Sequence, residues 1–358
     1  MHTRSPRCAA LILFWLACLP LVARAVPPTP DPARLAALEA AIAAEDIKQV
    51  TSVLLMVDGQ IAYEHYFNGA SADTLHDVRS ASKSVTAMLV GAAIGDGHLP
   101  GVQARVYDYF PAFTATHAVD PRLRATTVED LLTMSSLWEC DDENAFSTGN
   151  EERMYVTEAW LDFALALPVK GFAPWMTRPQ DSPHGRAHAY CTVNSFVLGA
   201  VLERATQMPL ADYAAQALER PLGITASRWN RSPDGIGMGG GGTRYRSRDL
   251  ARLGELVLAG GRWQGKALIP ADYVAAMVSA QASTGDGSDY GYQWWGLKLP
   301  VQGRETTLWA MSGNGGNYVF VIPDRKLVAV ITSSAYNRNY AHPQSRHILT
   351  GFLLPALD

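Results

Sequence analysis

The chain has 358 residues, of which 48% are hydrophobic and 18% are charged, an ordinary composition for a globular protein with a sizeable core. Its formal net charge of −4 gives no basic character of the kind that nucleic-acid partners require. The length allows either two domains or one body with an inserted lobe.

The first 25 residues have the pattern of an export signal, which we expect to lie outside the fold. Arg4 and Arg7 give a positive start, residues 9–22 are apolar, and Ala23-Arg24-Ala25 is a cleavage site of the A-x-A type. The apolar run is too short for a comfortable membrane span, and no later stretch reaches that length. We therefore predict a secreted or periplasmic protein, cleaved after Ala25, without stable membrane insertion afterwards.

The cysteines are consistent with an exported protein. Cys8 and Cys18 belong to the predicted signal, which leaves Cys140 and Cys191 as one pair. In an oxidising compartment a disulfide between them is the leading hypothesis, and two buried free thiols are the alternative.

Hydrophobic periodicity and turn residues divide the chain into three parts. The first part is expected to contain a proline-rich leader and a helix within residues 26–49, a hairpin of strands 50–57 and 60–67 joined at Asp58-Gly59, and a helix over 85–94. The middle part is expected to contain mostly helices, at 106–110, 126–134, 158–167, 196–205, 210–218 and 248–259. The last part is expected to contain strands at 306–311, 318–322 and 327–332 and a helix at 347–354.

This order predicts an α/β (α+β) fold. One antiparallel sheet is built from the N- and C-terminal segments and flanked by helices, and a mostly helical lobe is inserted at about residues 100–260. We expect residues 50–358 to form a single domain. Two irregular segments stand out within it. The acidic stretch 138–150 is predicted to be a loop and a candidate pocket wall, and the glycines of 237–242 indicate a tight backbone crossing beside the core.

The most informative short pattern is Ser80-x-x-Lys83, directly before the apolar run of the second helix. On a helix, residues three apart lie on the same face, so Lys83 is expected to reach Ser80. A serine hydroxyl is a poor nucleophile unless a base lies within hydrogen-bond reach and the site favours negative charge. A helix N-terminus supplies that favourable field, and a partly desolvated lysine helps with the proton.

Three motifs in order resemble those of the serine β-lactamase and penicillin-binding-protein superfamily. They are Ser80-x-x-Lys83, Tyr190-Cys191-Thr192 ahead of an apolar helix, and Asn314-Gly315-Gly316 between two apolar strand segments. The likeness is closest to the class C branch, with its esterases and 6-aminohexanoate-dimer hydrolases. It covers roughly residues 50–354.

The resemblance implies a role for each matching residue. Ser80 would attack a carbonyl carbon and form an acyl-enzyme, while Lys83 and Tyr190 would share the proton transfers. Tyr190 is the better candidate for general base when Lys83 stays charged, because a cation beside a phenol favours its deprotonated form. The oxyanion hole would be formed by the backbone N–H groups of Ser80 and Asn317.

The resemblance also suggests substrate-binding residues. Gly315 and Gly316 would let the substrate approach the backbone closely, with Asn314 beside them. Thr192 stands where the family often has an asparagine, so Asn194 is the candidate for that polar role. Trp294 is a candidate for a pocket wall.

Asn314 occupies a position at which penicillin-recognising enzymes carry a lysine and many esterase relatives a histidine. Losing that cation lowers the expectation of a β-lactamase or D-alanyl-D-alanine peptidase, since their substrates carry a carboxylate. Arg244 or Arg246 could substitute for the missing cation.

We therefore predict an exported serine hydrolase that cleaves a small-molecule ester or amide through an acyl-enzyme on Ser80. The alternatives are a β-lactamase or D-Ala-D-Ala peptidase, and a catalytically weak binding protein on the same fold. No cofactor and no metal are expected. His184, His188 and Cys191 have a spacing that would suit zinc, but Pro183 and Gly185 argue against a regular helix there. The sequence indicates no nucleic-acid partner and does not determine the oligomeric state.

Overall fold

The computed structural model describes residues 29–358, so the predicted export signal and the first residues of the leader lie outside the described residues. Within that range eight strands form one antiparallel sheet in the order β2-β1-β12-β11-β10-β9-β8-β7. The hairpin of β1 (Val50–Val57) and β2 (Gln60–Tyr66) pairs with the last strand, β12 (Leu327–Ser333). Both ends of the chain therefore build the sheet, as the sequence predicts.

The remaining strands come from the C-terminal third of the chain: β7 (Ala282–Ser283), β8 (Asp289–Tyr290), β9 (Trp295–Val301), β10 (Arg304–Gly313) and β11 (Asn317–Ile322). The sequence predicts β10 to β12 but not β9. In β9 the side chains of Leu297, Leu299 and Val301 are buried in alternation. Pro300 interrupts the apolar character of this run, which weakens the strand signal.

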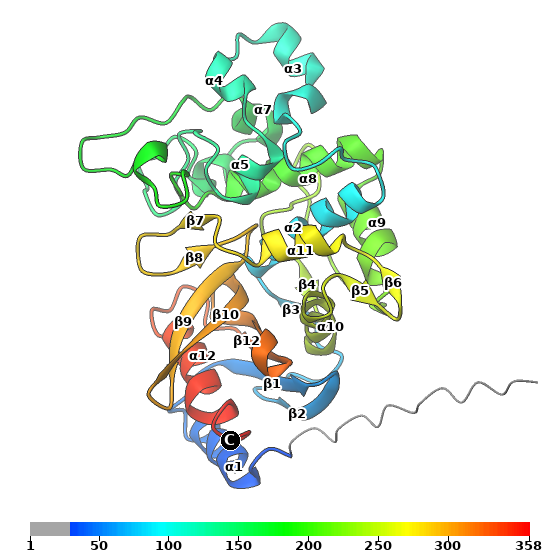
Figure 1. Ribbon diagram of the computed structural model, residues 1–358, viewed down its shortest axis with the longest axis vertical. Helices are drawn as coiled ribbons and strands as arrows, with labels where there is room; N and C mark the ends of the chain where they lie inside the picture. The colour runs from blue at the N-terminus through cyan, green and yellow to red at the C-terminus, as the bar shows by residue number, and fades with distance from the viewer. Residues whose placement is uncertain (1–28) are drawn as a thin grey trace, which may run out of the picture.

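Helices cover both faces of the sheet (Figure 1). On one face lie α1 (Pro32–Ala43) and the C-terminal helix α12 (Ala341–His347), which continues as a π-helical turn over Ile348–Leu353. On the other face lie α2 (Ala81–Gly95) and α10 (Ser247–Leu258). The glycine at position 254 lets α10 approach the sheet, because a Cβ there would stand 2.7 Å from Val328.

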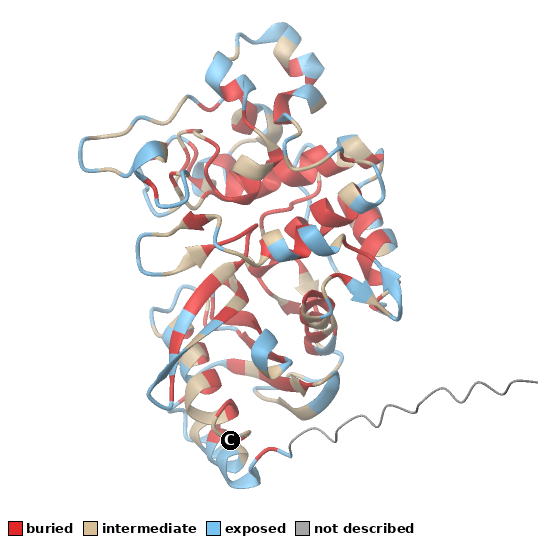
Figure 2. Ribbon diagram, in the orientation of Figure 1, coloured by how far each residue is buried: buried red, intermediate tan, exposed pale blue. Residues whose placement is uncertain are grey.

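The middle of the chain forms a helical lobe against α2 (Figure 1). Its α-helices are α3 (Pro111–Thr116), α4 (Pro121–Arg124), α5 (Val128–Leu132), α6 (Glu151–Tyr155), α7 (Trp160–Leu165), α8 (Thr192–Thr206) and α9 (Leu210–Ala214). A capping box between Thr127 and Asp130 starts α5. Figure 2 shows that α2 and α8 are buried almost throughout, so they form the centre of the molecule.

Short 3₁₀ and π turns accompany these helices at Val106–Tyr109, Pro179–Asp181 and Ala215–Glu219, and a further 3₁₀ turn, Pro323–Arg325, joins β11 to β12. Two small antiparallel pairs lie outside the main sheet: β3 (His76–Asp77) with β4 (Arg244–Tyr245), and β5 (Arg262–Trp263) with β6 (Lys266–Ala267). A further helix, α11 (Ala271–Met277), packs on α2. No helix within residues 29–358 has the length and apolar character needed to cross a membrane.

Candidate active site

Ser80 lies in the turn that leads into α2, at the junction of the sheet and the helical lobe. Residues 81–93 of the helix are all buried, so packing on every side fixes the position of its first turn. The preceding residue, Arg79, has a left-handed backbone with a φ of 50°. This sharp entry leaves Ser80 only partly buried while the helix behind it is completely enclosed.

Lys83 reaches Ser80 as the helical spacing predicts. Its Nζ donates a hydrogen bond to Ser80 Oγ at 2.9 Å and another to the carbonyl oxygen of Gly240 at 2.6 Å. The side chain is 1% exposed. Gly240 belongs to the glycine-rich segment 237–242, which crosses tightly beside α8: a Cβ on Gly239 would lie 2.5 Å from the Ser195 carbonyl oxygen. The crossing thus brings an acceptor to the lysine.

Tyr190 stands on the other side of Lys83, just before α8. The lysine Nζ lies 5.0 Å from the centre of the Tyr190 ring, which is within cation–π range. The ring also packs against Trp295, with 5.7 Å between their centres and a tilt of 33°. The structure therefore brings together the three residues predicted to carry the chemistry: Ser80, Lys83 and Tyr190.

A disulfide joins Cys140 to Cys191, the residue after Tyr190. It brings the acidic loop to the site and, with it, Asp142, which the sequence did not single out. One oxygen of Asp142 accepts a hydrogen bond from the backbone N–H of Thr192 at 2.6 Å, and the other accepts one from Glu151 N–H at 3.0 Å. The backbone N–H of Asp142 donates to the Tyr190 carbonyl oxygen at 2.9 Å.

Burial raises the pKa of the Asp142 carboxyl, although the positive charge of Lys83 opposes the shift. A partly buried carboxyl group near a buried lysine gives the site a charge partner that no short motif reveals. The sequence indicates the position of Asp142 only indirectly. Once Cys140 is paired with Cys191, any residue two positions after Cys140 must lie near Tyr190.

Ser80 lies on the wall shared by two cavities, of about 640 Å³ and 460 Å³. The larger cavity, which we call the Trp295 cavity, extends past Tyr190 and Trp295 to Arg338 and Arg346. The smaller one, the Asn230 cavity, extends past Gly241 to Asn230 and Arg231. A carbonyl group placed at Ser80 would therefore have room for a substituent on each side.

The backbone N–H groups of Ser80 and Asn314 are among the amides at this junction that have no hydrogen-bond acceptor within residues 29–358. Asn314 follows the last residue of β10, Gly313, and lines both cavities beside Ser80. Gly313 makes this approach possible, because a Cβ there would lie 2.0 Å from the Val78 carbonyl oxygen. Free N–H groups beside a nucleophile suit an oxyanion hole.

The structure does not bring Asn317, the other predicted oxyanion donor, to either cavity. Asn317 is paired with Gly313 in the strand ladder and is 1% exposed. Its side chain donates to the Asn314 carbonyl oxygen at 2.8 Å and accepts from Ser333 N–H at 3.1 Å. Asn317 therefore shapes the hairpin that presents Asn314.

Four predicted substrate-binding residues also lie away from the cavities. Gly315 and Gly316 have φ values of 90° and 79°, so they serve the turn between β10 and β11. Asn194 and Trp294 are 1% and 0% exposed, and each has a buried polar atom without a partner among the described residues. Trp295, the neighbour of Trp294, provides the cavity wall instead, because β9 turns alternate side chains to opposite faces.

The arginines proposed to replace the missing lysine lie elsewhere. Arg246 pairs with Asp249 at 2.7 Å, and Arg244 lies 3.9 Å from Asp77. Neither lines a cavity next to Ser80, whereas Arg338 and Arg346 do. Cys191 is occupied by the disulfide, and within residues 29–358 no group of three or more His, Cys, Asp or Glu side chains is arranged to hold a metal ion.

Comparison with known proteins places the chain in the family that the motifs resemble. The family model for β-lactamases matches residues 35–349 of this chain. The chain is also 26% identical over 324 residues to the 6-aminohexanoate-dimer hydrolase of Paenarthrobacter ureafaciens, covering 85% of this chain and 77% of that protein.

Solved structures share the fold. A class C β-lactamase from Rhodobacter sphaeroides superposes with a TM-score of 0.63 at 17% identity, covering 90% of this chain and 100% of its own. A family VIII carboxylesterase superposes with a TM-score of 0.67 at 18% identity, covering 92% of this chain and 99% of its own. The same arrangement of sheet and helical lobe therefore occurs in proteins named for different hydrolytic reactions.

Proposed function

Because this chain belongs to the β-lactamase family, a hydrolase family, we propose that it is an exported serine hydrolase that cleaves an ester or amide through an acyl-enzyme on Ser80. The observation that carries the proposal is the contact between Ser80 Oγ and Lys83 Nζ, at 2.9 Å, beneath the Tyr190 ring. A buried amine and a phenol beside one partly exposed hydroxyl form a nucleophile with its proton acceptors.

The proposed reaction has two steps. In acylation, Ser80 Oγ bonds to the carbonyl carbon, its proton passes to Tyr190 or Lys83, and the leaving group departs with that proton. In deacylation, a water molecule bonds to the same carbon and loses a proton to the same base. The bond between that carbon and Ser80 Oγ then breaks, the proton returns to Oγ, and the acid product leaves. When Lys83 is charged, Tyr190 is the base, because a cation beside a phenol stabilises negative charge on its oxygen.

The negative charge that develops on the carbonyl oxygen would be held by the backbone N–H groups of Ser80 and Asn314. Donors of this kind are aimed in advance, so they need no rearrangement during the reaction. The Ser80 amide also stands at the N-terminus of α2, where the helix dipole favours an anion. This assignment replaces Asn317 as the second donor.

Export is part of the proposal. Its support is the signal pattern of residues 1–25 together with the disulfide between Cys140 and Cys191, since disulfides persist in oxidising compartments.

A β-lactamase or D-alanyl-D-alanine peptidase is the second candidate, and one observation favours it. Arg338 and Arg346 line the Trp295 cavity, so a substrate carboxylate would meet a cation there. Turnover of nitrocefin compared with turnover of a short p-nitrophenyl ester separates the two candidates.

The first experiment is the intact mass of the mature protein after exposure to a fluorophosphonate, with Ser80→Ala alongside. One adduct on the parent and none on the variant is the expected result. No adduct on either protein would contradict the mechanism and favour the catalytically weak binding protein. Adducts on both would show that the reactive residue is not Ser80 alone.

A further inference from the structure

We propose that Glu129, on α5, is a positioning residue that sets the place of Tyr190 and Trp295 relative to each other. The inference rests on the proposed function, because Tyr190 is the base in that mechanism. Glu129 lines neither cavity beside Ser80. It acts through two other side chains, Arg186 and Tyr292, which belong to the two segments that carry the ring pair.

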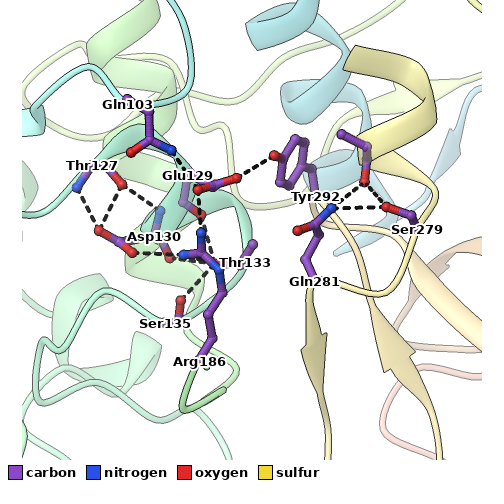
Figure 3. Close-up of polar contacts among 11 residues, drawn as sticks. Gln103, Thr127, Glu129, Asp130, Thr133, Ser135, Arg186, Ser279, Gln281 and Tyr292 are labelled. Atoms are coloured by element: carbon purple, nitrogen blue, oxygen red, sulfur yellow. Dashed lines mark hydrogen bonds and ion pairs between the residues drawn. The ribbon is translucent and has the colours of Figure 1, made fainter. Parts of the chain in front are cut away.

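The two oxygens of Glu129 are divided between these segments (Figure 3). Oε1 accepts a hydrogen bond from the Tyr292 hydroxyl at 2.6 Å. Oε2 accepts one from the Arg186 guanidinium and one from Gln103 Nε2, the latter at 2.8 Å. One carboxylate therefore joins α5, the long loop before α8 and the segment before β9.

We call the two hydrogen-bonded connections from Glu129 arms. The first arm runs through Arg186 to Tyr190. Arg186 lies four residues before it and also donates to Asp130 Oδ1 at 2.9 Å, so its guanidinium bridges two neighbouring carboxylates of α5. The planar fork of arginine suits such a bridge, which fixes both distance and orientation. Three residues further on, the backbone N–H of Ala189 donates to the Met134 carbonyl oxygen at 2.8 Å. The chain is thus held at two points immediately before Tyr190.

The second arm runs through Tyr292 to Trp295. Tyr292 lies three residues before it, and the next residue, Gln293, donates its backbone N–H to the Leu132 carbonyl oxygen at 3.0 Å. Tyr292 is 3% exposed, so its hydroxyl has few alternatives to Glu129. Both arms start from α5 and end at two rings in contact, with 5.7 Å between their centres. A shift of Glu129 would therefore change the position of the Tyr190 ring relative to the Trp295 ring.

The charge state of Glu129 agrees with its proposed role as a positioning residue. Burial acts to raise the pKa of Glu129, but the hydrogen bond from Tyr292 and the charge of Arg186 outweigh it, so the pKa lies below its usual value. The carboxylate stays ionised and accepts from both arms. Glu129 and Arg186 side chains are 14% and 20% exposed, so solvent screens the pair only in part.

The test compares Glu129→Gln with a matched control, Glu64→Gln. Glu64 on β2 also accepts from one tyrosine, Tyr66, and one arginine, Arg248, and its side chain is 13% exposed. It lines neither cavity beside Ser80. We measure kcat and KM on p-nitrophenyl acetate, the rate of fluorophosphonate labelling of Ser80, and Tm.

Glu129→Gln is expected to lower kcat and the labelling rate by about 10- to 100-fold, because a misplacement of about 1 Å can cost about 100-fold. KM should change less than kcat, since Glu129 itself lines neither cavity beside Ser80. Glu64→Gln should lower Tm without changing either rate per folded molecule. Equal labelling rates in the parent and Glu129→Gln would overturn the inference, as would equal losses in the two variants.

A second comparison stays informative if Glu129→Gln does not fold. Tyr292→Phe removes one hydroxyl from one arm, and it should slow labelling in the parent. In a Trp295→Ala background the same change should have no effect beyond about twofold, because the ring it positions is absent. Equal losses in both backgrounds would overturn the inference. Absence of any label on the parent protein would instead overturn the proposed function, and this inference with it.

Discussion

The two walls that meet at Ser80 are built differently. The wall that carries Tyr190 is held by a disulfide, by the hydrogen bonds of Asp142 and by the ion pairs around Glu129. The wall at the end of β10 is held by backbone pairing and by two hydrogen bonds between Asn314 and Asn337, at 2.6 Å and 2.8 Å. Proton transfer needs a side chain fixed in space, whereas the opposite wall needs only a backbone N–H at the right place.

Removal of the Tyr190 hydroxyl should give the largest loss on the first wall. We expect Tyr190→Phe to lower kcat by about 100- to 10,000-fold, the usual contribution of general acid–base catalysis. The phenylalanine ring keeps the packing on Trp295, so Tm should change little. The measurement is kcat on a p-nitrophenyl ester beside a melting curve. An unchanged kcat would assign the proton transfer to Lys83 alone.

On the second wall, the backbone amide of Asn314 is the sensitive group. Asn314→Pro removes the N–H and should lower kcat by about 100- to 1,000-fold, as loss of one oxyanion donor does. Asn314→Ala is the matched control, because it removes the contacts to Asn337 and keeps the N–H. If the two variants lost activity equally, the side chain rather than the amide would be the important part of this wall.

Removal of the disulfide tests how far the position of the wall that carries Tyr190 depends on this covalent link. Replacing both Cys140 and Cys191 by serine should lower the free energy of unfolding by about 2–4 kcal/mol. The loss of kcat per folded molecule should exceed the loss seen in an equally destabilised variant elsewhere, such as Glu64→Gln. Denaturant unfolding and active-site labelling give the two quantities. Stability loss without a loss of kcat would show that Asp142 and Tyr190 keep their places without the link.

The smallest expected effect on activity accompanies a change of pH, which acts on stability through the strand before Ser80. Burial lowers the pKa of His76 on β3 to about 4, from 6.5, and its Nδ1 lies 3.2 Å from Thr51 Oγ1. Because the unfolded chain binds the extra proton more readily, stability should be complete above pH 6.5 and fall between pH 6.5 and about 4.

The fall at pH 4 should approach about 3 kcal/mol, at about 1.4 kcal/mol for each unit of pKa difference. His76→Gln should flatten the curve of unfolding free energy against pH in this range. A curve as steep as that of the parent would assign the pH dependence to other groups.

Local sequence rules predict the contact between Ser80, the proposed nucleophile, and Lys83. They miss most of the residues that hold the wall carrying Tyr190. Residues three apart on a helix share a face, so the spacing alone is enough to place Lys83 at Ser80. Asp142 and Glu129 cannot be found in that way, because the partners that link them to the segments of Tyr190 and Trp295 lie about 50 to 160 residues away in the sequence. Such contacts follow from how separate segments pack, which no local pattern records.

The second wall shows a different limit. The sequence locates the hairpin between β10 and β11, but whether Asn314 or Asn317 faces the nucleophile depends on where the strand ends and the turn begins. The contact of Gly313 with Val78 decides that choice, and a glycine-rich motif does not reveal it. In the same way, adjacent residues of an extended segment point to opposite sides, so Trp295 and not Trp294 lines the cavity.

The pairing of β1 with β12 has a consequence for how the enzyme is made. Val50 faces Ser333, so the sheet cannot be completed until nearly the whole chain has left the ribosome. Ser80 and Lys83 are synthesised early, but the amide of Asn314 is added more than two hundred residues later. A nascent or truncated chain therefore carries the proposed nucleophile without the proposed oxyanion donor, and hydrolytic activity should begin only when synthesis is almost finished.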